Sequence, residues 1–161
     1  MPIMKIGHGY DVHAFGSGSY ITIGGVNIPC DMSIIAHSDG DVLIHALCDA
    51  IFGALGLGDI GRHFPDSDDV NKNRDSRDFL CEALSQMKEQ QYRLGNADIT
   101  IIAQTPRMAK HTEKMVKVLA ADLQCNEHAI NIKATTTESL GYIGREEGIA
   151  THAVVLLEKI S

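Results

Sequence analysis

The chain has 161 residues, of which 44% are hydrophobic and 22% charged, a balance typical of a single globular domain spanning residues 1–161. A net charge of −7 argues against broad nucleic-acid binding, which needs a basic face. No apolar run approaches the roughly 20 residues that cross a bilayer, and the N-terminus has no signal-peptide pattern. We therefore expect a cytoplasmic protein, or the mature part of a protein whose leader is missing, that binds neither nucleic acid nor membrane.

The first third of the chain predicts strands followed by a helix. Residues 3–12 predict one strand, and 20–28 predict two more around a Gly24-Gly25 turn. The segment 37–55 predicts a helix, because its apolar residues recur at helical spacing and Gly56 follows them. Ser38 and Asp41 resemble a capping box, with aspartate in place of the usual glutamate, so we expect Ser38 to cap this helix.

The rest of the chain alternates helices, strands and polar connections. Residues 59–74 are polar and predict a loop, and Gly95-Asn96 predicts a turn. Helices are expected at 76–91 and 110–123, strands at 98–104, 130–135 and 149–158, and a short helical turn at 137–140. This order favours an α/β (α+β) fold, namely a two-layer sandwich of a mixed four-stranded sheet with helices on one face, plus a small β-hairpin.

Asp11, His13 and His45 are the most informative polar residues. Asp11 and His13 lie two residues apart in an extended-looking segment at the end of the first predicted strand, so both can point to the same side. His45 lies in the predicted helix that follows. One carboxylate and two imidazoles suit Zn²⁺, and three protein ligands leave a fourth tetrahedral position open for chemistry. A chain with eight histidines brings some near carboxylates by chance, so spacing alone leaves the metal site open.

The helix face around His45 carries two carboxylates. Asp41 and Asp49 lie four residues before and after His45, and therefore share its face. Burying this face would be costly without a cation or other partners. A metal bound to His45 would offset this unfavourable free energy, and one neighbouring carboxylate could then orient the second ring nitrogen. A solvated helix face with an ordinary ion pair explains the same spacing equally well.

Two segments carry groups that suit phosphate. His37 and Ser38 precede the helix, whose first N–H groups attract anions, and Gly40 allows a close approach. In the segment 133–148, three threonines are followed by Glu138, a hard oxygen ligand for Mg²⁺ or Mn²⁺ bound to a diphosphate. Each segment has a plain structural alternative: helix capping in the first, and a strand running into a helix start in the second.

Five motifs follow one another along nearly the whole chain. They are GHGYDVHAFG (7–16), AHSDGDVLIHALCDA (36–50), GDIGRHFPD (58–66), TIIAQTPRM (100–108) and KATTTESLGYIGREEGIA (133–150). Together they resemble the 2-C-methyl-D-erythritol 2,4-cyclodiphosphate synthase family. The resemblance implies a lyase of isoprene and terpenoid biosynthesis by the non-mevalonate pathway. Such an enzyme converts 4-diphosphocytidyl-2-C-methyl-D-erythritol 2-phosphate into the 2,4-cyclodiphosphate and CMP.

The resemblance also implies the site residues. Asp11, His13 and His45 match the zinc ligands, and Glu138 matches the acid that holds a second ion, Mg²⁺ or Mn²⁺, with the substrate phosphates. His37 and Thr136 match the groups that assist the transition state. Substrate contacts are expected at Asp11, Val12, His13, His37, Ser38, Asp59, Ile60, Gly61, Phe64, Pro65, Asp66, Ser67, Asp68, Ala103, Gln104, Thr105, Pro106, Arg107, Met108, Ala109, Thr135, Thr136, Thr137, Glu138, Tyr142 and Arg145.

The family also suggests an assembly and a further ligand. Its members are homotrimers with active sites between neighbouring subunits, and an isoprenoid diphosphate can lie in a central apolar cavity. His152 stands where one branch of the family has an acid, which argues against that ligand here. His63 replaces an apolar residue, with little effect expected, and Arg107 replaces a common lysine while keeping its charge.

Two other functions share some of these features. A zinc-dependent phosphohydrolase would use the open metal position to generate hydroxide. A trimeric isoprenoid-diphosphate-binding module would need no catalysis. Product analysis separates these from the cyclase, because only a cyclase yields both CMP and a cyclic diphosphate.

Overall fold

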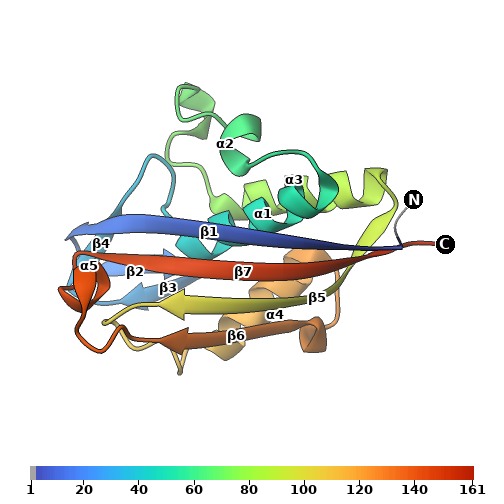
Figure 1. Ribbon diagram of the computed structural model, residues 1–161. Coiled ribbons are helices and arrows are strands. Elements are labelled where there is room, and N and C mark those ends of the chain that lie inside the picture. Colours follow the sequence, from blue (N-terminus) through green and yellow to red (C-terminus); the bar gives the residue numbers. More distant parts are fainter. Residues whose placement is uncertain (1–2) are drawn as a thin grey trace.

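A mixed five-stranded sheet with helices on one face forms the body of the protein. The computed structural model describes residues 3–161, and the strand order in the sheet is β4-β1-β7-β5-β6 (Figure 1). All neighbouring strands are antiparallel except β5 and β6. The strands are β1 (Met4–Ser17), β4 (Met32–Ile35), β5 (Tyr92–Ile102), β6 (Ile130–Thr135) and β7 (Gly148–Lys159). The predicted fold class is confirmed.

The sheet has one strand more than the sequence predicted. This is β4, a four-residue strand that pairs with the far end of β1 between Ala14 and Ser17. So short a segment gives too few alternations to be recognised from its pattern. The small hairpin forms as predicted, from β2 (Tyr20–Ile23) and β3 (Val26–Pro29).

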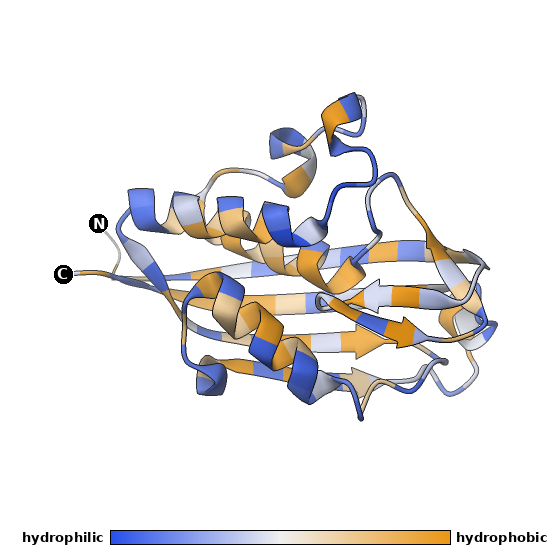
Figure 2. Cartoon of the chain, turned by 180° about the vertical axis from the view of Figure 1, so that it is seen from behind, coloured by the Kyte–Doolittle hydropathy of each residue, from blue (hydrophilic) through white to orange (hydrophobic). Residues whose placement is uncertain are grey.

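Three long helices cover one face of the sheet. They are α1 (Val42–Leu55), α3 (Ser76–Glu89) and α4 (Thr112–Leu123), as predicted to within a few residues except at the start of α1. Helix α1 is apolar and buried along nearly its whole length, because the sheet covers one side and α3 another (Figure 2). Within residues 3–161 no helix has the length and apolarity that spanning a membrane demands.

Two glycines in β1 let α1 lie directly against the sheet. A Cβ atom on Gly7 would lie 1.8 Å from the carbonyl oxygen of Ala50, and one on Gly9 would lie 1.8 Å from that of Ala46. Any side chain at either position would therefore push the helix away. This close packing places the first turns of α1 beside the residues that follow Gly9 in the strand.

Three local predictions differ from the structure. The predicted turn at Gly95-Asn96 is a β-bulge inside β5, which starts at Tyr92, because the pairing with β7 shifts register and continues. The predicted loop 59–74 contains the short helices α2 (Ile60–His63) and η1 (Asp69–Asn71). The predicted helical turn at 137–140 is an irregular turn, followed by α5 (Gly141–Gly144).

On the other face of the sheet, the described residues leave apolar side chains of β1 and β7 exposed. Ile6 is 75% exposed and Val154 is 44% exposed, on the neighbouring strands β1 and β7. His8 and His152 lie on these strands, with His8 Nε2 2.9 Å from His152 Nδ1. An exposed apolar face of this kind is typical of an interaction surface. The remaining short helix, η2 (Glu127–Ala129), precedes β6.

Candidate metal centre

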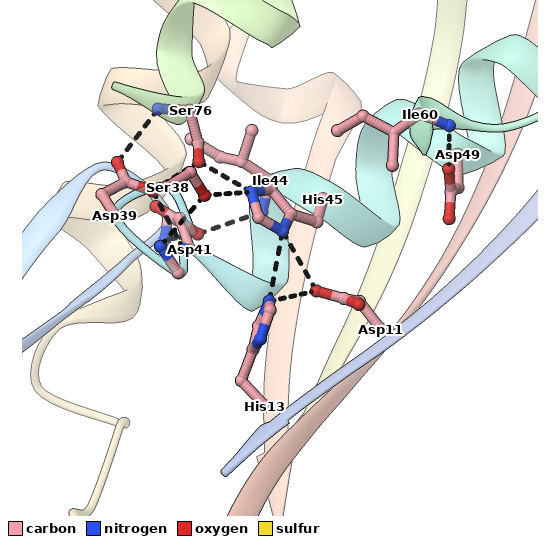
Figure 3. A network of polar contacts seen from close by, with 12 residues as sticks. Asp11, His13, Ser38, Asp39, Asp41, Ile44, His45, Asp49, Ile60 and Ser76 are labelled. Carbon is pink, nitrogen blue, oxygen red and sulfur yellow. Dashed lines mark hydrogen bonds and ion pairs between the residues drawn. The ribbon is translucent and has the colours of Figure 1, made fainter. Parts of the chain in front are cut away.

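Asp11, His13 and His45 point at one spot between β1 and α1 (Figure 3). Asp11 Oδ2 lies 2.9 Å from His13 Nε2 and 3.2 Å from His45 Nδ1, and the two ring nitrogens are 3.3 Å apart. Asp11 and His13 share a face because they alternate along the strand. His45 reaches them because Gly7 and Gly9 allow α1 to approach.

The three side chains fit a transition-metal ion. Their donor atoms all lie within 4.8 Å of one another, and they are one carboxylate oxygen and two imidazole nitrogens. Ligands at 2.0–2.1 Å from a tetrahedral ion lie about 3.3 Å apart, close to the separations seen here. With three protein ligands, such an ion would keep one position open for a further oxygen ligand.

Asp11 and His45 each shift the pKa of the other in the direction that favours its charged form. Burial opposes ionisation of Asp11, but hydrogen bonds with His13 and His45 outweigh it and lower the pKa of Asp11 to about 2. Burial likewise opposes protonation of His45, but Asp11 outweighs it and raises the pKa of that imidazole. Asp11 is therefore a carboxylate at neutral pH, as a metal ligand must be.

The second ring nitrogen of His45 is held by serines. His45 Nε2 lies 2.8 Å from Ser76 Oγ and 3.3 Å from Ser38 Oγ (Figure 3). Ser76 in turn donates its hydroxyl to Asp39, and its backbone N–H donates to Asp39 Oδ2 over 3.0 Å. Ser76 and Asp39 were not predicted from the sequence, because 37 residues separate them and no periodic pattern links such distant positions.

The predicted role of the two carboxylates on the helix face is wrong. Asp41 caps α1 by accepting from the N–H of Ile44, and it also accepts from Gly24 and Gly25 of the hairpin turn. Asp41 therefore takes the capping role predicted for Ser38. Asp49 accepts from the N–H of Ile60, over 2.7 Å. Neither carboxylate orients His45, because both are occupied by backbone donors.

A cavity of about 170 Å³ opens beside the three converging side chains. His37 Nε2 is buried there without a hydrogen-bond partner among the described residues, so it is free to meet a ligand. Other predicted contacts, Ser38, Ile60, Phe64 and Asp66, line the same cavity. Ala36, Asn71 and Phe79, which were not predicted as site residues, complete the lining.

A second cavity, of about 350 Å³, lies at the opposite edge of the sheet. The strands β7 and β5 separate β1 from β6, whose last residue, Thr135, lines this cavity. The two cavities share no lining residue within the described part of the chain. Most predicted contacts of the 103–109 segment gather here, in a lining of Ala103, Gln104, Pro106, Arg107, Met108, Ala109, Ala134, Thr135 and Thr136.

Several predicted contacts lie in neither cavity. Val12 is 41% exposed on the outer sheet face, because it alternates with Asp11 and His13. Tyr142 shares a hydrogen bond of 3.0 Å with Tyr10 near that face, and Arg145 pairs with exposed Glu147. The remainder, which line neither cavity, are Asp59, Gly61, Pro65, Ser67, Asp68, Thr105, Thr137 and Glu138.

Comparison with known proteins agrees with this geometry. Residues 4–158 match the sequence model of the YgbB family. The chain is 59% identical over 154 residues to the 2-C-methyl-D-erythritol 2,4-cyclodiphosphate synthase of Stutzerimonas stutzeri, covering 96% of this chain and 98% of the relative. It is also 59% identical over 158 residues to the enzyme of the same name from Thioalkalivibrio sulfidiphilus, covering 98% and 99% of the two chains.

Solved structures share the fold. An IspF from Plasmodium falciparum in complex with CDP has a TM-score of 0.88 at 35% identity, covering 98% of this chain and 97% of the other. The bifunctional IspDF from Campylobacter jejuni has a TM-score of 0.94 at 44% identity, and this chain covers 43% of that longer protein. On the match over residues 4–158 and the near-full-length relatives, the chain belongs to the YgbB family.

Proposed function

We propose that this chain is a metal-dependent phosphorus–oxygen lyase that converts 4-diphosphocytidyl-2-C-methyl-D-erythritol 2-phosphate into 2-C-methyl-D-erythritol 2,4-cyclodiphosphate and CMP. The observation that carries the proposal is the meeting of Asp11, His13 and His45 beside a cavity, in a chain 59% identical to enzymes of that name. The activity belongs to the non-mevalonate route to isoprenoids. We place it in a single catalytic domain, residues 1–161, that works in the cytoplasm.

The reaction asks the protein for positioning and charge stabilisation. The 2-phosphate of the substrate attacks its own β-phosphorus and CMP leaves, so the chain needs no nucleophile of its own. This agrees with a cavity that offers imidazoles, a serine and carboxylates. His37, with its unpartnered Nε2, would donate to a phosphate oxygen there. Thr136 would assist from the second cavity with its hydroxyl.

Two cations complete the proposal. Asp11, His13 and His45 would hold Zn²⁺, whose preferred ligands they supply. Glu138 would share Mg²⁺ or Mn²⁺ with the substrate phosphates, because an exposed carboxylate is a hard ligand for these ions. When bound, the cations neutralise phosphate charge and align the attacking and leaving oxygens.

The second cavity would hold the cytidine. Its lining carries backbone groups for the base, a cationic side chain at Arg107 and hydroxyl groups at Thr135 and Thr136. A solved relative from Plasmodium falciparum is described as a complex with CDP, which supports a cytidine ligand. The same cavity lining would recognise CMP as the leaving product.

A homotrimer would unite the two cavities. They lie at opposite edges of one sheet, three strand spacings or roughly 14 Å apart across it. The uncovered apolar face of β1 and β7 offers a surface for contact between copies, and Tyr142 and Arg145 lie on the β7 side of the molecule, where a neighbour could reach them. An isoprenoid diphosphate in a central cavity stays a prediction that His152 disfavours.

Replacing His45 by alanine tests the proposal. The variant should lose zinc, measured by metal analysis of the purified protein, and should lose release of CMP from the cytidyl substrate with Mg²⁺ present. Wild-type protein should give a cyclic diphosphate, identified by its phosphorus spectrum. A linear phosphate product would indicate the phosphohydrolase, and no CMP from the wild type would indicate a binding module. Normal turnover by zinc-free protein would contradict the metal role.

A further inference from the structure

His45 is held from two sides, and only one of them faces the proposed metal. Its Nδ1 points to Asp11 and His13, while its Nε2 lies 2.8 Å from Ser76 Oγ (Figure 3). Ser76 is fully buried at the first turn of α3, and His45 is 9% exposed. The contact therefore lies where water cannot replace a lost partner.

Ser76 also binds Asp39 twice. The hydroxyl of Ser76 donates to Asp39 Oδ1, and its backbone N–H donates to Asp39 Oδ2 over 3.0 Å. Asp39 Oδ1 accepts a third hydrogen bond from the N–H of Asp41, also over 3.0 Å. Asp39 is thus fixed between the start of α3 and the residue that caps α1.

Counting hydrogens decides which nitrogen of His45 is protonated. A carboxylate can only accept, so the single hydroxyl hydrogen of Ser76 is committed to Asp39. Toward His45, Ser76 Oγ can then only accept, so the single hydrogen of the neutral imidazole must sit on Nε2, and Nδ1 donates to Asp11 only when the ring is protonated. In this tautomer the lone pair of Nδ1 faces Asp11 and His13, which is the arrangement that a metal requires.

We propose that Ser76 and Asp39 are positioning residues that lock His45 in its Nε2–H tautomer and fix its ring plane for metal binding. The inference rests on the proposed metal role of His45 and adds to it two residues from another helix and loop. Helix α3 therefore contributes to the site, because its first turn places Ser76 beside Nε2 of His45. Partners of this kind typically change metal affinity by about tenfold to a hundredfold.

The first experiment measures zinc affinity of full-length protein by competition with a chelator. Ser76→Ala should bind Zn²⁺ about tenfold to a hundredfold more weakly than wild type, because Nε2–H then loses its nearer acceptor and keeps only Ser38 Oγ, 3.3 Å away. Ser76→Thr keeps the hydroxyl and should recover most of the affinity. Ser85→Ala, on the exposed side of the same helix, is the matched control and should bind zinc as the wild type does.

The second experiment reads the tautomer directly. The imidazole ¹⁵N shifts of His45 in metal-free protein, at a pH where the ring is neutral, should show a single Nε2–H form in wild type and in Ser76→Thr. Ser76→Ala should show a mixture of tautomers. Asp39→Asn should do so too, because the NH2 group of asparagine can donate to Ser76 Oγ and leave the serine hydrogen free to point at Nε2 of His45. It also keeps the size of the side chain should Ser76→Ala fail to fold.

The outcomes separate this inference from the function itself. Wild-type zinc affinity together with an unchanged Nε2–H signal in both Ser76→Ala and Asp39→Asn would overturn the positioning role. A tautomer shift with zinc affinity unchanged would overturn it equally, because the ring would then need no locking. A loss of cyclase activity without a change in zinc affinity or tautomer would concern only the proposed reaction, because neither the zinc titration nor the ¹⁵N measurement uses substrate.

Discussion

Asp41 shows how a single buried residue serves two elements. Its carboxylate is fully buried and accepts from Ile44 in α1 and from Gly24 and Gly25 in the hairpin turn. It therefore caps the helix and ties the hairpin to it with the same two oxygens. Removing it would leave buried donors of both elements without partners.

Asp41→Ala should lower the free energy of unfolding by about 2–4 kcal/mol, because a lost cap and unpaired buried N–H groups add together. Denaturant unfolding measures the change. Asp75→Ala is the matched control, since Asp75 is exposed and caps α3 through one N–H, that of Arg77. It should cost about 1 kcal/mol. Equal losses in the two variants would refute the double role of Asp41.

Asp11 predicts a specific acid sensitivity of metal-free protein. Its pKa is lowered from 3.8 to about 2, so its contribution to stability is present above the higher value and lost as the pH falls through the lower one. The difference in unfolding free energy between wild type and Asp11→Asn should therefore shrink by about 2 kcal/mol from pH 5 to pH 2. Urea unfolding at several pH values measures it, and a constant difference would contradict the ion pair with His13 and His45.

At the scale of elements, the contact of α1 with β1 decides whether the metal ligands meet. Gly7 and Gly9 remove the side chains that would separate helix from strand. The next residues on that face of β1 are Asp11 and His13. Because the backbones of α1 and β1 lie close together here, both side chains come within reach of His45.

Gly9→Ala should both destabilise the protein and weaken zinc binding. Its Cβ would lie 1.8 Å from the carbonyl oxygen of Ala46, so α1 must move, at a cost of about 3 kcal/mol or more in unfolding free energy. Thermal unfolding and chelator competition measure the two effects. Gly53→Ala is the control: a Cβ atom on Gly53 would lie 4.0 Å from the carbonyl oxygen of His8, an ordinary contact, so this change should be neutral or stabilising.

The short helices of the 60–71 segment illustrate what periodicity misses. Asp59 and Asp68 cap α2 and η1, which are three or four residues long and have no apolar stripe to detect. They nevertheless place Ile60 and Asn71 in the lining of the cavity beside Asp11, His13 and His45, here called the metal cavity. A polar stretch in a sequence can thus be ordered by capping alone.

At the scale of the whole molecule, the two cavities predict complementation between copies. If each active site joins the metal cavity of one subunit to the cytidine cavity of its neighbour, His45→Ala and Arg107→Ala should each be inactive or strongly impaired alone. A random co-assembly of equal amounts of both variants should regain about a quarter of wild-type activity, because about one interface in four then pairs two intact halves.

CMP release by the co-expressed, purified mixture measures this recovery. Separately purified variants combined without exchange of subunits are the control and should remain at their individual levels. If mass analysis shows mixed trimers but the mixture stays inactive, both cavities of an active site belong to the same subunit. An active monomer would also contradict a site shared between subunits.

The sequence by itself determined the elements with long, regular patterns and the residues tied to motifs. The helices around Leu47 and Leu119 and the hairpin at Gly24-Gly25 follow from local spacing, and Asp11 and His13 share a face because strands alternate. Residue chemistry suggested His45 as their partner, and the family resemblance supported that choice, which spacing alone left open. These features depend on neighbours along the chain, which a single sequence displays.

Only the tertiary structure decided what distant residues do for one another. It assigned Asp41 to the hairpin and Asp49 to Ile60, and it brought Ser76 and Asp39 behind His45. It also set the two cavities at opposite edges of the sheet. These hydrogen bonds join residues 11 to 37 positions apart and depend on how the elements meet in space, about which local periodicity carries no information.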